Sequence, residues 1–143
     1  MLRGLTTVSL YATDVRAAAA WYAELLGIEP YYETLVGDAP AYLEFRLGDY
    51  QHELGIIDAR WAPPGRGPGE TGVVAYWAVD DLGATLERLR TMGATDHLPV
   101  TEHGPGFVTA SVVDPFGNVL GVMRNQHYLD VLGSFTERSR AGS

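Results

Sequence analysis

Two stretches of this chain follow the same plan at a constant spacing of 66 residues. Asp14 follows a short β-type run and precedes a helix-favouring stretch that ends at Gly27, while Asp80 and Gly93 bracket a second such stretch. A duplication constrains the fold more than any single motif, because each copy must build the same supersecondary unit. A third pair of matching stretches has the same spacing: Leu-Gly-Ile at 54–56 and Leu-Gly-Val at 120–122.

The aspartates and glycines predict where two helices begin and end. Asp14 and Asp80 are predicted N-caps, because a carboxylate accepts hydrogen bonds from the free backbone N–H groups of a first helical turn. Glycine suits the left-handed residue that ends a helix. Each half is therefore predicted to be β-α-β-β-β. The predicted helices are 15–26 and 81–92, and the predicted strands are 8–12, 31–35, 42–47, 51–57, 74–79, 98–101, 107–113 and 119–123.

The repeat predicts one domain built from two modules. The first module covers residues 1–57 and the second covers 73–125. Three prolines and four glycines between them, at 58–72, are typical of an extended connection. Residues 126–143 are predicted to be a tail with a short helical turn at 128–132 and a loose end from 136 onward.

Composition excludes several classes of function. The chain has no cysteine, so it forms no disulfide and offers no thiolate to a substrate or metal. Its ten basic residues are all arginine, which excludes a Schiff-base lysine. A net charge of −8 disfavours nucleic acid and is compatible with a cationic ligand. The sequence shows no membrane-length apolar run and no signal-peptide pattern, so we expect a soluble, cytoplasmic protein.

Two segments carry a family resemblance. They are "VSLYATDVRAAAAWYAELLGIEPYY" at 8–32 and "FVTASVVDPFGNVLGVM" at 107–123. With these segments the chain resembles the vicinal oxygen chelate superfamily, which includes glyoxalases, bleomycin-resistance proteins and extradiol dioxygenases. The resemblance implies an α+β fold, in which two tandem βαβββ modules form curved mixed sheets around a cavity and the helices lie outside. It also implies a homodimer.

Metal-using members of that superfamily take one ligand from the first and one from the last strand of each module. The resemblance places these four positions at Thr7, Glu53, Val74 and Gly121. Only Glu53 is a usual ligand type, and one carboxylate cannot hold a transition metal. We therefore expect no metal ligands and no cofactor. One divalent ion held by Glu53 and unrecognised residues remains the alternative.

Strand alternation predicts which side chains line a ligand pocket. Glu53 is the candidate catalytic base or partner of a cationic group, the alternative being a solvated edge carboxylate. Gly121 would leave room where a ligand-holding side chain otherwise stands. Trp61 is either a stacking lid or an anchor for the connection, and Tyr11 and Tyr76 are alternatively packing residues. The predicted ligand-binding set is Ser9, Tyr11, Gln51, Trp61, Tyr76, His103, Thr109, Gly121 and Met123.

Three functions fit these residues. The leading one is metal-independent binding of a small molecule, cationic or aromatic, as in the bleomycin-type resistance proteins that the chain resembles. The second is an enzyme of the glyoxalase or dioxygenase type, either with a metal or with Glu53 as a metal-free base. Contact between Glu53 and His103 across the cavity would favour that enzyme. The third is a protein-interaction scaffold without catalysis.

Overall fold

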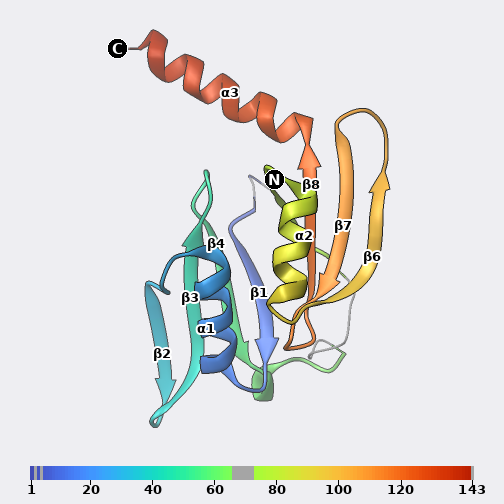
Figure 1. The fold of residues 1–143 in the computed structure, drawn as a ribbon. Coiled ribbons are helices and arrows are strands. Elements are labelled where there is room, and N and C mark those ends of the chain that lie inside the picture. Colours follow the sequence, from blue (N-terminus) through green and yellow to red (C-terminus); the bar gives the residue numbers. More distant parts are fainter. Residues whose placement is uncertain (2, 4, 66–72, 143) are drawn as a thin grey trace.

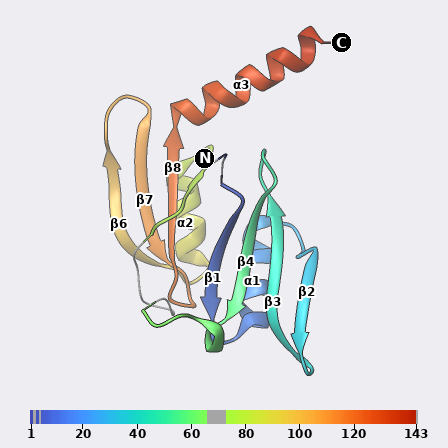
Figure 2. The ribbon, with the colours of Figure 1, turned by 180° about the vertical axis from the view of Figure 1, so that it is seen from behind.

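The computed structural model describes residues 1, 3, 5–65 and 73–142 and contains two four-stranded sheets, one from each half of the chain. The helices α1 and α2 cover one side of the sheets (Figure 1), and the view from behind shows the opposite side (Figure 2). The first sheet, sheet A, contains β1 (Thr7–Ala12), β2 (Tyr32–Val36), β3 (Ala39–Leu47) and β4 (His52–Asp58). The second, sheet B, contains β5 (Tyr76–Ala78), β6 (Thr95–Glu102), β7 (Phe107–Val113) and β8 (Val119–Asn125).

The two sheets have the same topology, which confirms the α+β fold with two βαβββ modules. Sheet A has the strand order β1-β4-β3-β2, and sheet B has the order β5-β8-β7-β6. In each sheet the first strand pairs in parallel with the last, and the remaining neighbours are antiparallel. The helices are α1 (Val15–Leu26), α2 (Leu82–Thr91), the short 3-10 helix η1 (Ala59–Trp61) and α3 (Gln126–Ala141).

The helix signals are confirmed in the first module and displaced by one residue in the second. Asp14 caps α1 by accepting from the Ala17 N–H, and Gly27 ends it at φ 69°. The prediction that Asp80 caps α2 is wrong, because Asp81 accepts from the Ala84 N–H instead. Two adjacent aspartates offer the same cap, and the helix begins after the second. Gly93 is left-handed as predicted.

The same one-residue displacement is seen in the pairing of the first strand of each module. Ser9 of β1 lies opposite Gly55 of β4, and Tyr76 of β5 lies opposite Gly121 of β8. The last strands are therefore related by 66 residues, whereas the first strands and helix caps are related by 67. The equivalent of Ser9 is consequently Tyr76, a much larger side chain.

The two family-like segments meet between the modules. The Tyr22 hydroxyl of α1 donates to Asp114 Oδ2 over 2.6 Å, and both residues are buried. Burial, and secondarily the Asp114 carboxylate, raises the pKa of Tyr22 well above its ordinary value. Asn118 Nδ2 donates to the Tyr11 carbonyl over 2.9 Å, and Trp21 Nε1 donates to the Met92 carbonyl over 2.7 Å. These bonds fix one module against the other.

The prediction for the tail is wrong. The tail is a 16-residue helix, α3, instead of a short turn and a loose end. Asn125 caps it, and Arg138 and Arg140 lie in its last turn, where cations are stabilised by the helix dipole. The connection 58–72 begins as the end of β4 and then η1, and residues 66–72 of it lie outside the described residues.

No helix in the described part of the chain is long and apolar enough to cross a membrane.

Candidate functional site

The helix-free face of sheet A carries an unusual set of polar side chains. Along β3, Leu43 and Phe45 point into the core. The residues that alternate with them, Tyr42, Glu44 and Arg46, therefore point to the opposite face. Arg46 lies opposite Glu53 in the β3–β4 pairing. Strand alternation therefore places two carboxylates, Glu44 and Glu53, on neighbouring strands of one face.

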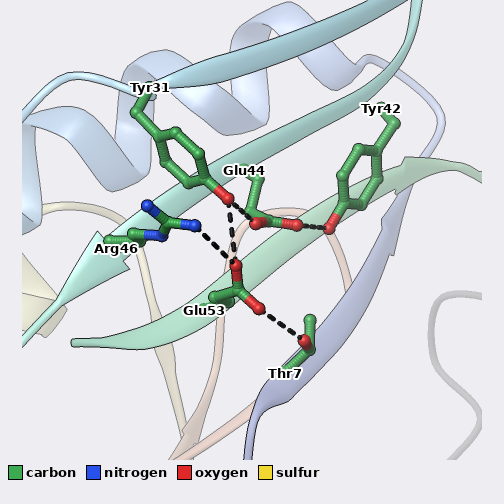
Figure 3. A network of polar contacts seen from close by, with 6 residues as sticks. All are labelled: Thr7, Tyr31, Tyr42, Glu44, Arg46 and Glu53. Carbon is green, nitrogen blue, oxygen red and sulfur yellow. Dashed lines mark hydrogen bonds and ion pairs between the residues drawn. The ribbon is translucent and has the colours of Figure 1, made fainter. Parts of the chain in front are cut away.

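Tyrosine and threonine hydroxyls hold these carboxylates together (Figure 3). The Tyr31 hydroxyl is hydrogen-bonded to Glu44 and lies 3.0 Å from Glu53 Oε2. The Tyr42 hydroxyl donates to the other oxygen of Glu44. Thr7 Oγ1 donates to Glu53 Oε1 over 3.1 Å. We call this set the carboxylate cluster: Thr7, Tyr31, Tyr42, Glu44, Arg46 and Glu53.

Arg46 is a cation already bound by this cluster. Its guanidinium lies over the Tyr31 ring, 4.2 Å from the ring centroid, and 3.5 Å from Glu53 Oε2. A guanidinium over an aromatic face and beside a carboxylate is held by a cation–π contact and an ion pair together. The Arg46 side chain is still 53% exposed, so its ion pair with Glu53 is weak and another cation can displace the guanidinium.

The cluster changes the pKa of its members. The pKa of Glu53 is lowered by side-chain hydrogen bonding, chiefly with Glu44 and then with the hydroxyls of Tyr31 and Thr7. Hydrogen bonding to Glu44 raises the pKa of Tyr31 to about 12. Burial, followed by the bond to Glu44, raises the pKa of Tyr42 further. Glu53 is therefore ionised at neutral pH, and both tyrosines remain hydrogen-bond donors.

Glycine makes room for a tyrosine ring at equivalent points of the two sheets. A Cβ at Gly55 would lie 2.5 Å from the Tyr42 hydroxyl oxygen. A Cβ at Gly121 would lie 2.7 Å from the Tyr76 ring and from the Ala75 carbonyl oxygen. The expectation that Gly121 leaves open space for a ligand is wrong, because the Tyr76 ring occupies that space.

Three other residues of the first half that were predicted to bind the ligand lie outside the carboxylate cluster. Ser9 is exposed on β1 opposite Gly55. Gln51 was predicted to begin the strand 51–57, but it lies in the β3–β4 turn at φ 54°, before β4 begins, and its amide donates to the Gly48 carbonyl. Trp61 is 58% exposed in η1, beyond the far end of β4. Asp58 comes five positions after Glu53 on β4, which puts about 17 Å of strand between the two.

The predicted residues of the second half form a separate group on sheet B. His103 Nε2 lies 2.8 Å from Thr109 Oγ1, and both are near the β6–β7 turn. Met123 Sδ accepts from Asn125 Nδ2 over 3.6 Å. Glu53 belongs to sheet A, and its contacts are with Thr7, Tyr31 and Arg46. Glu53 thus lies in sheet A, whereas His103 lies in the β6–β7 connection of the other module.

Four cluster members were missed by the sequence reasoning: Tyr31, Tyr42, Glu44 and Arg46. The signal for three of them is the alternation Tyr42-Leu43-Glu44-Phe45-Arg46, in which polar and apolar residues exchange at every step. Pairing this strand with the next one in a hairpin brings Arg46 to Glu53. Tyr31 precedes β2 and gave no comparable signal.

The residues present do not fit the metal site that the family resemblance implies. Since Gly55 corresponds to Gly121, the equivalent of Glu53 is Val119 and not Gly121 as predicted, and valine offers no ligand atom. Within the described ranges, no group of three or more His, Cys, Asp or Glu side chains comes close enough to hold a metal ion. Around Glu53 the donors are hydroxyl and guanidinium groups, and a guanidinium repels a metal cation.

The family follows from a direct match. The model of the Glyoxalase/Bleomycin resistance protein/Dioxygenase superfamily matches residues 4–122. The chain belongs to this superfamily. Curated protein sequences give no match.

Solved structures of the superfamily share the fold at low sequence identity. TnmS3, described as an antibiotic binding protein from Streptomyces sp. CB03234, has 23% identity and a TM-score of 0.62, with 85% of this chain and 94% of that chain covered. The lactoylglutathione lyase from Agrobacterium tumefaciens has 22% identity and a TM-score of 0.64, with 86% and 94% covered. TioX from Micromonospora sp. ML1 has 18% identity and a TM-score of 0.63, with 85% and 98% covered.

Proposed function

We propose that this protein binds a cationic, aromatic small molecule on the helix-free face of sheet A without a metal ion. The observation that carries this proposal is the hold of the cluster on its own cation, Arg46, through the Tyr31 ring and the Glu53 carboxylate. A cation of the ligand would take the same two contacts, or the adjacent place beside Glu44.

Charge and aromatic surface support this ligand class. Glu44 and Glu53 both present acceptor oxygens on this face, and Tyr31 has only one proton to share between them. A second positive group is therefore favoured there. Tyr32 and Tyr42 lie next to each other with ring centroids 6.3 Å apart, and Tyr32 is 52% exposed. These rings offer a surface on which a planar ligand stacks.

An antibiotic-sized ligand is consistent with one structural relative. TnmS3 is described as an antibiotic binding protein and shares the fold of this chain. We place the present protein in the same broad role, as a protein that sequesters a small molecule, and we include a homodimer and a cytoplasmic location in the proposal. Sedimentation equilibrium would test the dimer.

Catalysis by Glu53 is the weaker alternative. A general base works best with a pKa near the operating pH, and the pKa of Glu53 is lowered from an already acidic value. An ionised carboxylate with so low a basicity is better suited to attract a cation than to remove a proton.

A matched pair of probes tests the proposal. N-methylacridinium carries a permanent charge, and acridine is the same ring system, neutral at about pH 8. We expect the charged probe to bind the full chain at least about tenfold more tightly, with most of that preference lost in Glu53→Gln and Glu44→Gln. Glu87→Gln on α2, remote from the cluster, is the control. Equal binding of both probes, or an unchanged preference in both cluster variants, contradicts the proposal.

The metal-free part of the proposal has its own test. Chelator-treated protein and Glu53→Gln are titrated calorimetrically with Ni²⁺, Zn²⁺, Fe²⁺ and Mn²⁺. We expect no stoichiometric binding by either protein. Micromolar binding that disappears in Glu53→Gln would show a metal centre and overturn this part.

A further inference from the structure

A cavity lies between the two modules, on the helix side of sheet A and away from the carboxylate cluster. Its volume is about 500 Å³, within the range of pockets that enclose drug-sized molecules. Both modules contribute apolar side chains to it. We call it the seam cavity, and its principal apolar walls are Val8, Leu25 and Leu54 of the first module and Trp77, Leu89 and Val122 of the second.

Asp49, Tyr128 and Arg88 are polar residues that line the cavity. Tyr128, at the start of α3, donates its hydroxyl to Asp49 Oδ2 in the β3–β4 turn over 2.7 Å. Arg88 of α2 also lines the cavity and donates one N–H to the Glu24 carbonyl over 2.8 Å. A guanidinium has five N–H donors, so this single bond leaves Arg88 able to bind an anion in the cavity.

The first turn of α3 borders the cavity through Tyr128. The helix leaves β8 and passes over the end of the molecule where the β3–β4 turn lies (Figure 1). The Tyr128 hydroxyl bonds Asp49 of that turn, and the rings of Tyr128 and Phe135 both pack edge-on against Tyr50 of the same turn. No residue of α3 is buried along its described length. Contacts between partly exposed side chains therefore hold α3 beside this edge of the cavity.

We propose that the seam cavity is a second ligand site, which binds an apolar small molecule bearing one anionic group. The apolar body fills the space between the modules, where burying a charge would be costly. The anionic group, a carboxylate or sulfonate, pairs with Arg88 at the rim. This site goes beyond the proposed function, since its ligand has the opposite charge and occupies a different side of sheet A.

Two fluorescent probes with one ring skeleton test this site. N-phenyl-1-naphthylamine is neutral, and 8-anilino-1-naphthalenesulfonate adds one anionic group; both brighten when buried. Thr85→Phe fills the cavity from α2. Thr91→Phe is the matched control on the same helix, because both threonine hydroxyls bond the backbone carbonyl four residues earlier. Ala78→Phe, on the β5 wall, is the second filling variant should Thr85→Phe not fold.

We expect both probes to bind the full chain, and either filling variant to weaken both at least about tenfold while Thr91→Phe leaves them unchanged. Arg88→Gln should weaken the sulfonate several-fold and leave the neutral probe unaffected. Glu53→Gln should change neither, which separates this site from the carboxylate cluster. The proposal is overturned if neither probe binds, if Thr91→Phe acts like the filling variants, or if probe binding falls as protein concentration rises, because a second copy would then occupy the cavity.

Discussion

An alanine at each of the two paired glycines should destabilise the protein to different degrees, and only the one in sheet A should affect binding. At Gly121 the new Cβ would meet the Ala75 backbone carbonyl at 2.7 Å, and a backbone group in a strand pairing cannot turn aside. At Gly55 it would meet the end of the Tyr42 side chain at 2.5 Å, which can rotate away. The new methyl group thus collides with a backbone carbonyl in sheet B and with the movable Tyr42 ring in sheet A.

The size of each effect follows from what must move. Overpacking that shifts backbone costs about 1–3 kcal/mol, so we expect Gly121→Ala to lower the free energy of unfolding by about 2 kcal/mol. At about 3 °C per kcal/mol for a chain of this size, Tm should fall by about 6 °C. Gly55→Ala should cost less than about 1 kcal/mol. By moving the Tyr42 hydroxyl away from Glu44, it should also weaken binding of N-methylacridinium.

Urea unfolding, thermal melts and probe titration on both variants check these values. A larger loss of stability in Gly55→Ala than in Gly121→Ala would refute the reasoning. So would full retention of N-methylacridinium binding in Gly55→Ala, because Tyr42 would then have no part in the site.

Three further perturbations test other parts of the account. Tyr22→Phe removes a buried bond to the Asp114 carboxylate and should lower the free energy of unfolding by about 1.5–3 kcal/mol in urea titrations, whereas an unchanged midpoint would contradict a role in joining the modules. Arg46→Gln removes the internal cation and should tighten N-methylacridinium binding about threefold or more; weaker binding would show that Arg46 serves the ligand. The pKa of Tyr31 is raised from 10.0 to about 12, so its contribution to stability is complete below pH 10 and lost as pH rises through 12. Absorbance titration of tyrosinate should show one late-titrating group fewer in Tyr31→Phe, and identical curves would contradict this value.

The architecture could be predicted because the repeat, the caps and strand alternation are local signals. Asp14, Gly27 and Gly93 act through their own backbone neighbours, so their roles follow from residue type and spacing. The errors arose where two local signals competed. Asp80 and Asp81 both suit an N-cap, and only packing of the helix decides between them. The end of the chain from 136 onward, predicted to be loose, continues the helix α3 to Ala141.

The site was only partly predictable because its contacts depend on strand pairing. Glu53 was singled out from its place in the family pattern, but its partners come from β1, β3 and the segment before β2. Those partners become neighbours only when register and sheet order are known. The Tyr76 ring over Gly121 has the same origin, since it depends on a one-residue shift between the modules.

The most direct test of the central claim is a calorimetric titration of N-methylacridinium into chelator-treated protein, with and without one equivalent of Zn²⁺. The account predicts stoichiometric binding with the same affinity in both titrations, reduced at least about tenfold in Glu53→Gln. Binding that requires Zn²⁺, or the absence of binding in both titrations, would contradict a metal-independent cation site on the helix-free face of sheet A.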